Sequence, residues 1–417
     1  MPMRPVLSVT FESHVGDVPF IGLSALLRRS FAGEDVSALG PGLIERVQQH
    51  NDLYALLDLS TVLQLHYQRE AGLSVLAEAV SARPLYRVKQ ARSASALRML
   101  VLKAPGDLMS NTPVECLLDE FEITLDVLYV SPGVALPGVL PDHDVLLVAV
   151  GESDENQPIL AQLTEVLANW PRPVLNVPAR VSRLARHIAS ELLGRVPGVI
   201  MPTTVRVDRE QLQQLADGRA LIGAVFEGGA FPLIARPVGS HAGSGLVKLE
   251  QPAEIEAYLA QHPESQFYVA RFFNYASPDG LFRKYRVVMV AGRPFVCHMG
   301  ISQHWVVHYP YEEMIADPSR RAEEQQIMAS FDEGMGRRHQ AAFDALQRRV
   351  GLDYWGMDCA ETADGDLLIF EVTSAMVIHA MDRIDVFPYK QAQMKTVFGA
   401  FQRMLGQTAR AAANSIV

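Results

Sequence analysis

The sequence predicts an α/β protein built from two or three packed units. Its 417 residues exceed what one hydrophobic core normally supports, and hydrophobic and charged residues make up 49% and 20% of the chain, as in globular proteins. Apolar runs alternate with a helical pattern between residues 97 and 176, which is typical of a small parallel sheet. We therefore expect folded domains throughout.

Charge and composition narrow the classes of partner. The formal net charge is −10 and no dense Lys/Arg run occurs, which disfavours nucleic acid as a partner. No apolar stretch of about 18 residues is present and the first residues lack the apolar segment of a secretory signal, so we expect no membrane association and a cytoplasmic location. Cys116, Cys297 and Cys359 are too few and too scattered for a disulfide framework or a zinc site, and we expect them to be buried.

Residues 20–90 carry a helical pattern. Apolar positions recur every three or four residues from Ile21 and again from Leu53 to Leu65, and no strand pattern interrupts them. Residues 51–86 fit a pair of antiparallel helices of the tetratricopeptide kind, but only one such unit is present and solenoids need about three. Two alternatives stay open: a plain helical cap, or a surface that recruits a protein partner.

The predicted parallel sheet follows. Apolar runs at 97–102, 124–130, 144–150 and 173–176 are separated by loops and by a helical pattern at 158–167. Thr112-Pro113-Val114-Glu115 predicts a capping box at a helix start, with proline at the first helical position. The loop 106–111 lacks the spaced glycines of a dinucleotide fingerprint, which disfavours a nicotinamide or flavin site.

A glycine-rich hairpin is expected between residues 232 and 249. An apolar run enters a loop with three glycines and returns in a second strand, and glycine lets backbone N–H groups approach phosphate oxygens closely. The loop matches neither a Walker loop nor a kinase glycine loop. An ordinary glycine-rich turn remains the alternative. The candidate nucleotide-binding residues here are Arg236, Gly239, Ser240, His241, Gly243, Ser244, Gly245 and Lys248.

An acidic hairpin is predicted between residues 354 and 374. An Asp-Gly turn joins two apolar runs and should bring Asp358 and Glu371 within reach of each other. Carboxylates among apolar residues need a compensating cation. With the hydroxyl of Thr373 they form an oxygen-rich set suited to Mg²⁺, which takes one or two carboxylates and leaves room for nucleotide phosphates. The alternative is a hairpin with two outward-facing acids.

A third hairpin, rich in arginine, precedes the acidic one. Arg286 opens an apolar strand and can offer a bidentate fork to phosphate or carboxylate, although an ordinary surface charge needs no function. The stretch beyond the returning strand is dense in polar and aromatic groups that could line an acceptor pocket. Together with the neighbouring lysine, the candidate substrate residues are Lys284, His304, Trp305, His308 and Tyr309.

The order of glycine flap, connecting strand, arginine-led hairpin and acidic hairpin resembles the ATP-grasp superfamily, especially ribosomal-protein glutamate ligases and related peptide ligases. The resemblance covers roughly residues 173–405, and its most specific element is an aspartate followed after thirteen residues by a glutamate and after two more by an asparagine. Asp358, Glu371 and Thr373 have this spacing. Three positions depart from the pattern: Arg236 stands for a lysine, Arg186-His187 for an earlier lysine, and Thr373 for the asparagine.

The resemblance implies an ATP-grasp fold in which two α+β subdomains hold ATP between them. The expected order is a helical region at 1–95, a Rossmann-like domain at 96–178, an N-subdomain with the flap at 179–271 and a C-subdomain with the metal site at 272–417. It implies ATP and two Mg²⁺ ions, with Mn²⁺ as an alternative, held by Asp358, Glu371 and Thr373, and Arg286 as the catalytic residue. It also implies that a strand presents its backbone to adenine, through Tyr268, Val269, Ala270, Arg271 and Phe272.

The activity implied is that of an ATP-dependent carboxylate–amine ligase, which forms an amide or peptide bond through an acyl-phosphate. Its substrates would be small-molecule or peptide carboxylates and amines. A non-catalytic ATP-binding scaffold and an ATP-dependent phosphotransferase remain open as alternatives. So does a homodimer, because the sequence does not set the oligomeric state.

Overall fold

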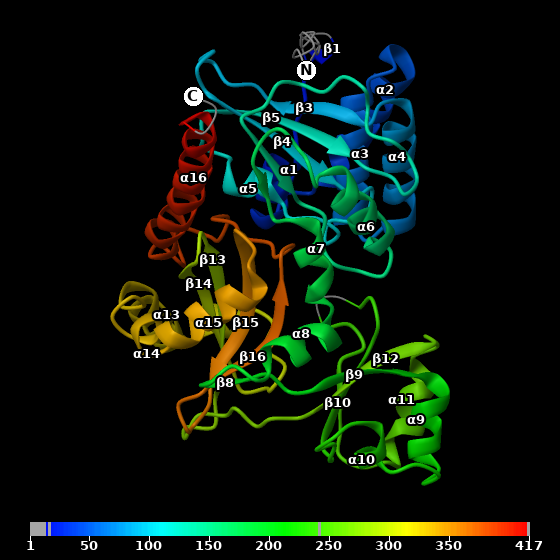
Figure 1. Ribbon diagram of the computed structural model, residues 1–417, viewed down its shortest axis with the longest axis vertical. Helices are drawn as coiled ribbons and strands as arrows, with labels where there is room; N and C mark the ends of the chain where they lie inside the picture. The colour runs from blue at the N-terminus through cyan, green and yellow to red at the C-terminus, as the bar shows by residue number, and fades with distance from the viewer. Residues whose placement is uncertain (1–13, 16–17, 241–242, 415–417) are drawn as a thin grey trace. The chain divides into compact units, whose positions relative to one another are not determined.

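The computed structural model describes residues 14–15, 18–240 and 243–414. They fall into two compact units: unit 1 draws on residues 1–182, 352–355 and 374–417, and unit 2 on residues 183–351 and 356–373 (Figure 1). Both units combine helices with sheets, so the predicted α/β class is confirmed. No helix among the described residues is long and apolar enough to cross a membrane.

Unit 1 begins with a short strand pair and a group of helices. The strands are β1 (His14–Val15) and β2 (Val18–Pro19). The helices that follow are α1 (Leu23–Phe31), the 3₁₀ turn η1 (Val36–Leu39), α2 (Gly40–His50), α3 (Leu53–Leu65) and α4 (Arg69–Ala82). Asp52 caps α3 by accepting hydrogen bonds from the backbone N–H groups of Tyr54 and Ala55, which satisfies two donors that the first turn leaves unpaired. Helices α3 and α4 pack side by side, as the pattern predicts for 51–86.

The sheet of unit 1 has five strands in the order β3-β5-β4-β6-β7. Their bounds are β3 (Leu85–Lys89), β4 (Leu97–Lys103), β5 (Ile123–Tyr129), β6 (Val145–Val148) and β7 (Val174–Leu175). Strands β4 to β7 are parallel and largely buried, which explains their unbroken apolar runs and confirms the predicted parallel sheet.

Strand β3 corrects the sequence analysis, which predicts no strand between residues 20 and 90. It pairs antiparallel with β5 at the edge of the sheet. Pro84 lies two residues beyond the end of α4 and favours a helix end, and the Leu-Tyr-Arg-Val run after it has the aromatic and branched residues of a strand. The helical periodicity before Pro84 hid this short segment.

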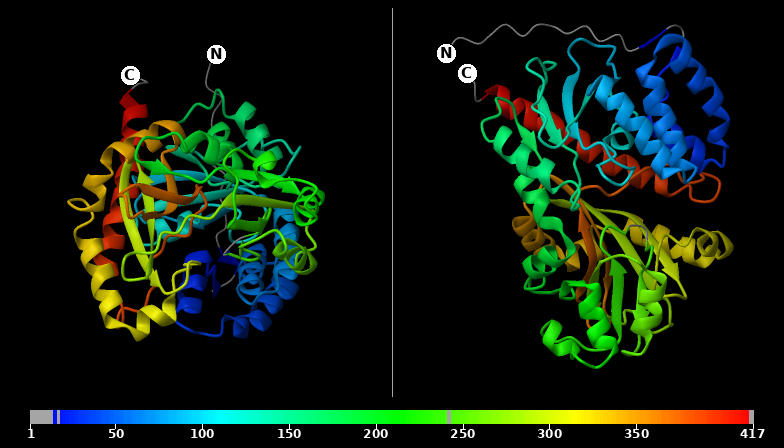
Figure 2. Two further views of the ribbon diagram at one scale, coloured as in Figure 1. Left: turned by 90° about the horizontal axis from the view of Figure 1, so that it is seen from below. Right: turned by 90° about the vertical axis from the view of Figure 1, so that its right-hand side faces the viewer.

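The predicted capping box is also wrong. Helix α5 (Val114–Leu117) follows Pro113, which stands at the cap, and no side chain caps it. Thr112 Oγ1 donates to the carbonyl of Ser374 at 2.7 Å, and Glu115 pairs with Lys103 at 2.5 Å. Both side chains are therefore committed to other elements of unit 1. The remaining helices of this unit are α6 (Gln157–Val166), α7 (Pro178–Val181) and α16 (Lys390–Asn414), and α16, red in Figures 1 and 2, packs against β6.

Unit 2 contains an antiparallel four-stranded sheet in the order β11-β10-β12-β9. Its strands are β9 (Thr204–Asp208), β10 (Leu233–Pro237), β11 (Val247–Leu249) and β12 (Gln266–Arg271). Helices α9 (Arg209–Ala216) and α11 (Glu254–Gln261) cover one face, where Leu212, Ile255 and Leu259 pack against Phe267 and Val269. The pairing of β10 with β11 confirms the predicted hairpin at 232–249.

The second sheet of unit 2 has five strands in the order β14-β13-β15-β16-β8. They are β8 (Val199–Ile200), β13 (Phe282–Val290), β14 (Arg293–Ser302), β15 (Tyr354–Glu361) and β16 (Leu367–Thr373). Both predicted hairpins are confirmed, and the turn between β13 and β14 places Ala291 and Gly292 at positive φ. The other helical segments are η2 (Ser182–Leu184), at the junction of the two units, and, in unit 2, α8 (Arg186–Leu193), α10 (Ile222–Val225), α12 (Tyr311–Ala316), α13 (Pro318–Ala329), α14 (Met335–Arg338) and α15 (Gln340–Val350).

The three cysteines are free and buried, as predicted. Burial raises the pKa of Cys116 and of Cys297 to about 12, so both stay as thiols at neutral pH. They contribute apolar volume to the interior.

The Asp58 carboxylate in α3 generates the first prediction. It accepts backbone hydrogen bonds from Ile21 and Gly22 at 2.9 and 2.8 Å, yet burial raises its pKa from 3.8 to about 6. Between these values the folded state holds more protons than the unfolded state, so stability falls as pH rises from about 4 to about 6. In urea denaturation, we expect the free energy of unfolding of the wild type to fall by about 2–3 kcal/mol more than that of Asp58→Asn over this pH range. The exposed Asp364→Asn should behave as wild type, and equal pH profiles for wild type and Asp58→Asn would contradict the assignment.

Candidate functional site

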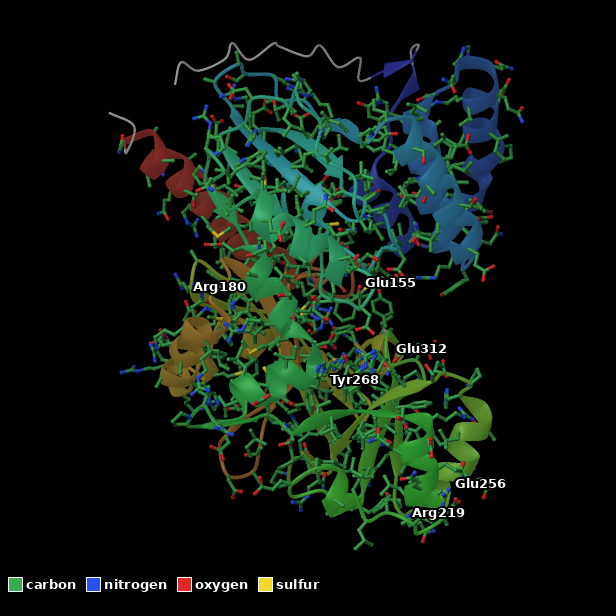
Figure 3. All side chains as sticks on the ribbon, turned by 45° about the vertical axis from the view of Figure 1, so that its right-hand side comes forward. Glu155, Arg180, Arg219, Glu256, Tyr268 and Glu312 are labelled. Carbon is green, nitrogen blue, oxygen red and sulfur yellow. The ribbon has the colours of Figure 1, made fainter. Side chains whose placement is uncertain are left out.

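One face of the four-stranded sheet carries basic and aromatic side chains. The register pairs Ile234 with Lys248 and Ala270, and Arg236 with Tyr268, so these side chains share one face of the sheet. It is the face opposite to the one that α9 and α11 cover. Figure 3 labels Tyr268 in this part of unit 2. The sheet therefore separates an apolar core from a face with two buried or half-buried cations.

One face of the five-stranded sheet carries the predicted metal ligands. Asp358 lies directly opposite Glu371 in the β15–β16 ladder, and Gly356 lies opposite Thr373, so Asp358, Glu371 and Thr373 point to the same side. Lys284 and Arg286 on β13 reach this side too, because both side chains bond to Asp358. The hairpins bring together the residues that the sequence analysis singled out.

Asp358 is the centre of a three-residue ion cluster. Lys284 Nζ donates to its Oδ2 at 2.9 Å, and Arg286 donates to Oδ1 through Nε at 2.9 Å and to Oδ2 through Nη2 at 3.2 Å. The Asp358 side chain is only 8% exposed. Burial alone would raise the pKa of Asp358, but the two cations hold it well below the usual range. The same pairing keeps the pKa of Arg286 above its usual value despite burial.

Glu371 forms the second ion pair. Arg186, at the start of α8, approaches Glu371 Oε2 to 2.7 Å. Burial would raise the pKa of Glu371, yet the charges of Arg186 and Arg236 lower it. Burial and the neighbouring Arg186 lower the pKa of Arg236 to about 10, a value that still keeps the guanidinium charged at neutral pH.

Arg236 also anchors the glycine flap. Its Nε donates to Ser240 Oγ at 3.1 Å, its Nη2 donates to the Ser240 carbonyl, and Ser240 Oγ donates to the Pro237 carbonyl at 2.8 Å. Gly239, Gly243 and Gly245 all have positive φ, as a tight flap requires. Ser244 is exposed, and His241 lies outside the described residues. The flap therefore starts from a buried cation.

The structure corrects the predicted adenine contact. Tyr268, Val269 and Ala270 are paired on both sides, with β10 and with β9, so the ladders use their backbone groups. Strand β12 ends at Arg271, and the Phe272 N–H still donates to the Pro232 carbonyl at 2.9 Å. The chain leaves the sheet after this hydrogen bond. The ring of Tyr268 stacks on that of His187, with the ring centroids 5.9 Å apart, and Arg271 is exposed.

Lys248 is committed to aromatic and acidic neighbours. Its ammonium lies 4.2 Å from the centroid of the Phe272 ring and 2.7 Å from a Glu250 oxygen. The ring of Trp305 meets Phe272 edge-on at 5.6 Å. Phe272 and Trp305 thus form an aromatic wall beside the cationic face.

The predicted substrate residues separate into two groups. His308 belongs to the charged cluster: burial and the charges of Lys284 and Arg236 lower its pKa, and its ring lies under Gly243 of the flap. Lys284 belongs there as well. Tyr309, in contrast, donates its hydroxyl to the buried Glu324 at 2.8 Å. His304 and His308 are both exposed, but no contact in the described part of the chain links His304 to the charged residues. We assign Tyr309 to holding the loop rather than to substrate contact.

Mg²⁺ needs oxygen ligands, and this face of the sheet supplies a small set of them. No group of three or more His, Cys, Asp or Glu side chains that could hold a metal occurs in the part of the chain that the structure describes. Two carboxylates on one face suffice for Mg²⁺ when substrate phosphates complete its shell, and Asp358 and Glu371 meet this requirement with Thr373 beside them. Both carboxylates now face cationic side chains, so the set fits the metal only together with a polyphosphate that draws those cations away.

No family model matches the chain, and no curated protein matches it. Among solved structures, the chain is similar to a RimK domain protein ATP-grasp from Sphaerobacter thermophilus, with 18% identity over 74% of this chain and 99% of that one and a TM-score of 0.42. It is also similar to the VanG D-Ala:D-Ser ligase from Enterococcus faecalis (12% identity, 76% of this chain and 100% of that one, TM-score 0.47) and to the D-alanine-D-alanine ligase from Coxiella burnetii (11% identity, 76% and 97%, TM-score 0.45). All three likenesses have identities below 20% and TM-scores below 0.5.

Two residues that contact this site, Arg186 and His187, were not among the candidates named from the sequence. Arg186 was noted only as a departure from a lysine, and His187 was noted with it. Their place at the first turn of a short helix, far along the chain from both hairpins, gives no local pattern that links them to Glu371 or Tyr268. Only two unpaired carboxylates in apolar strands, which require cations from elsewhere, could have indicated them.

Removing the charge of Asp358 should destabilise unit 2. Asp358→Asn leaves Lys284 and Arg286 half-buried without their counter-ion, and breaking such a pair costs about 3 kcal/mol. Glu371→Gln should cost about 1 kcal/mol, because the Glu371 side chain is 35% exposed and solvent screens its pair. Urea denaturation checks both values against the exposed Asp364→Asn, which should change little. Equal losses for Asp358→Asn and Asp364→Asn would contradict the burial of the cluster.

The flap glycines offer a matched pair of substitutions. Alanine at Gly239 or Gly243 should cost about 1–2 kcal/mol from positive φ, but only at Gly243 would the new Cβ lie 2.2 Å from His308 Nε2. We expect Gly243→Ala to be the more destabilising, and His308→Ala to remove the difference. Chemical denaturation of the two single and two double variants measures this coupling, and a difference that persists without His308 would contradict the contact.

Proposed function

We propose that the protein is an ATP-dependent carboxylate–amine ligase that forms an amide bond through an acyl-phosphate. One observation carries the proposal: four cations surround two opposed carboxylates within unit 2. The cations are Arg186, Arg236, Lys284 and Arg286, and the carboxylates are Asp358 and Glu371. The excess of two positive charges, four against two, suits a polyphosphate bound together with a divalent cation.

The two sheets of unit 2 would hold the nucleotide between them. Arg236 and the flap that starts at Ser240 supply positive charge and backbone N–H groups for the phosphates. Phe272 and Trp305 supply an aromatic surface for the base, at the point where β12 leaves its sheet. This assignment moves the adenine contact from 268–270 to the end of the strand.

Arg286 is the proposed catalytic residue. The Arg286 guanidinium, which bonds to Asp358 in this structure, would turn to the transferred phosphoryl group or to the oxyanion of a tetrahedral intermediate and stabilise the charge that develops there. The neutral amine attacks the carbonyl carbon of the acyl-phosphate, and collapse of that intermediate breaks the carbon–oxygen bond and releases phosphate, which takes up the proton that the nitrogen loses. Closure of the flap over His308 would exclude water, which would otherwise hydrolyse the acyl-phosphate.

Asp358, Glu371 and Thr373 would hold Mg²⁺ when a nucleotide is bound. The metal supplies charge neutralisation along the phosphates and helps to orient the transferred group. The chain's own contribution is to place two carboxylates opposite each other on a rigid hairpin. The substrates proposed are an amino acid, a peptide or a small carboxylate together with an amine.

A non-catalytic ATP-binding scaffold is the second candidate. It is favoured by the commitment of both Asp358 oxygens to Lys284 and Arg286, which leaves this carboxylate neutralised without a metal. Such a protein would bind ATP through the cations and never turn it over.

Substrate-dependent release of phosphate or ADP from Mg-ATP separates the two candidates. With pooled amino acids, dipeptides and small carboxylates we expect release that Glu371→Gln abolishes and that Arg286→Met lowers by about 10²-fold, the usual loss for one donor to a developing oxyanion. Mass spectrometry should then find an amide. Asp364→Asn, in the exposed turn of the same hairpin, is the control and should keep full activity. ATP binding without release under any mixture would overturn the ligase proposal in favour of the scaffold, and a phosphorylated product without an amide would indicate a phosphotransferase.

A further inference from the structure

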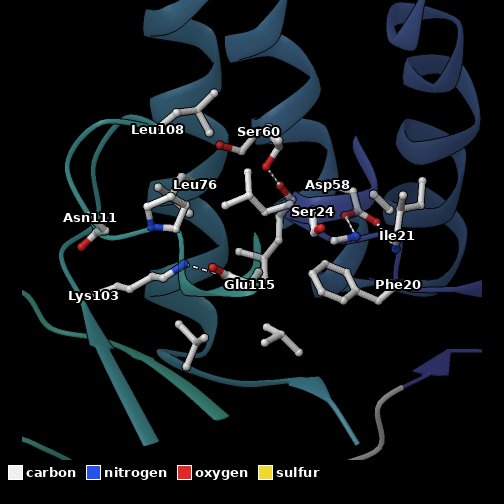
Figure 4. A pocket seen from close by; sticks show the side chains of 18 of the residues that line it. Phe20, Ile21, Ser24, Asp58, Ser60, Leu76, Lys103, Leu108, Asn111 and Glu115 are labelled. Carbon is white, nitrogen blue, oxygen red and sulfur yellow. Dashed lines mark hydrogen bonds and ion pairs between the residues drawn. The ribbon is translucent and has the colours of Figure 1, made fainter. Parts of the chain in front are cut away.

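Glu324 of α13 is a buried acid to which the proposed reaction assigns no role. It has no exposed surface. Another buried acid, Asp58 of unit 1, lines the cavity shown in Figure 4 and fixes the residues before α1 by accepting from the backbone N–H groups of Ile21 and Gly22. Glu324 accepts hydrogen bonds from two different elements of unit 2. Because a buried carboxylate needs donors to compensate it, these partners show what Glu324 holds together.

Helix α13 covers the outer edge of the five-stranded sheet. Strand β14 stands at one end of the strand order, so the backbone groups on its outer side have no neighbouring strand among the described residues. Glu324 Oε1 accepts from the Met299 N–H at 3.0 Å, and Arg320, four residues earlier in α13, donates through Nη1 to the Ile301 carbonyl at 2.9 Å. Met299 and Ile301 are two positions apart, so their backbone groups point to the same edge. The buried acid and the buried cation therefore fix α13 to this strand.

The second oxygen of Glu324 holds the loop that connects β14 to α12, residues 303–310. Glu324 Oε2 accepts from the Tyr309 hydroxyl at 2.8 Å, near the end of this β14–α12 loop. Nearer its start, the Tyr275 hydroxyl donates to the Trp305 carbonyl at 2.5 Å. The loop is therefore tied to its surroundings at two points that lie four residues apart.

The β14–α12 loop presents two side chains to the proposed nucleotide site. Val307 is buried in an apolar cluster, whereas the next residue, His308, is exposed, and a Cβ added to Gly243 of the flap would lie 2.2 Å from its Nε2. The ring of Trp305 meets that of Phe272 edge-on, with the ring centroids 5.6 Å apart. Release of one end of the loop should disturb both contacts, because they lie on or next to the residues that anchor it.

We propose that Glu324 is a positioning residue for the proposed nucleotide site. Through Tyr309 it holds the β14–α12 loop so that Trp305 stays beside Phe272 and His308 stays beneath the flap, and it strengthens nucleotide binding without touching the nucleotide. A carboxylate suits this place better than an amide, because both groups aimed at it are donors and an amide would turn its NH₂ group towards one of them. The inference rests on the proposed function, since it gives Glu324 a role in ATP binding.

Tyr309→Phe and Glu324→Gln in the full-length protein test this role by two measurements. Hydrogen exchange read on the peptide that covers residues 303–310 reports on the loop, and titration calorimetry with Mg-ATP reports on the site. We expect Tyr309→Phe to speed exchange of the loop and to weaken Mg-ATP binding about fivefold, because it deletes one hydrogen bond to a carboxylate. Glu324→Gln should act in the same direction, and the double variant should bind about as weakly as the weaker single variant, because the two residues share one bond.

Glu323→Gln is the matched control. Glu323 is the neighbouring acid of α13 and pairs with Arg283 at 2.5 Å, so its loss removes an ion pair of the same helix without touching the loop. It should leave both loop exchange and Mg-ATP affinity unchanged. A role for Glu324 in stability alone would lower the urea midpoint and leave the affinity as in the wild type.

The outcomes separate this inference from the proposed function. If Glu324→Gln fails to fold, Tyr309→Phe decides, because it leaves the bond between Glu324 and Met299 in place. Loop exchange or Mg-ATP affinity that is the same in Tyr309→Phe as in a wild type that binds Mg-ATP would overturn the inference and leave the ligase proposal standing. A wild type that does not bind Mg-ATP would overturn both.

Discussion

The buried carboxylate of Asp358 is the interaction on which the proposed site depends. Its neighbours in β15, Met357 and Cys359, are apolar and buried, and an isolated charge at this depth would be too costly to keep. Lys284 and Arg286 from the neighbouring hairpin compensate its charge. The pairing of β13 with β15 therefore places the two cations that keep Asp358 ionised. A change at any of the three residues removes part of this charge compensation.

Arginine at two positions where the resemblance expects lysine has a physical consequence. Arg236 bonds to both the hydroxyl and the carbonyl of Ser240, which a single ammonium on a flexible stem would hold less firmly. Arg186 sits opposite Glu371 in the same way. The planar fork of Arg236 fixes the base of the flap, and Arg186 links the start of α8 to the acidic hairpin through Glu371 and the Phe370 carbonyl.

Local patterns predicted the parts of this structure that depend on local sequence. The three hairpins of unit 2, the parallel strands of unit 1 and the placement of Asp358 opposite Glu371 follow from apolar runs and turn residues. Strand β3 was missed because five residues after a helical segment leave little periodicity to detect. The predicted capping box was wrong because Thr112 and Glu115 bond to partners elsewhere in the fold. Arg186 was not among the candidate site residues because its partner, Glu371, lies 185 positions away in the chain, 371 − 186. Side chains whose roles depend on tertiary contacts produce no pattern among neighbouring positions of the sequence.

The same cluster can serve either candidate function, and the balance of charges explains why. In the described structure the carboxylates and the cations satisfy one another, which makes unit 2 stable without a ligand. An incoming polyphosphate would compete with Asp358 and Glu371 for Arg186, Arg236, Lys284 and Arg286, and each cation that turns to a phosphate exposes a carboxylate oxygen. Those oxygens then have the geometry to accept a divalent cation. In the proposed ligase, binding of nucleotide and completion of the metal site would therefore be coupled, because one event would release the groups that the other requires. In a scaffold, Lys284 and Arg286 would stay bonded to Asp358 when the nucleotide binds, so this carboxylate would not become available to a metal.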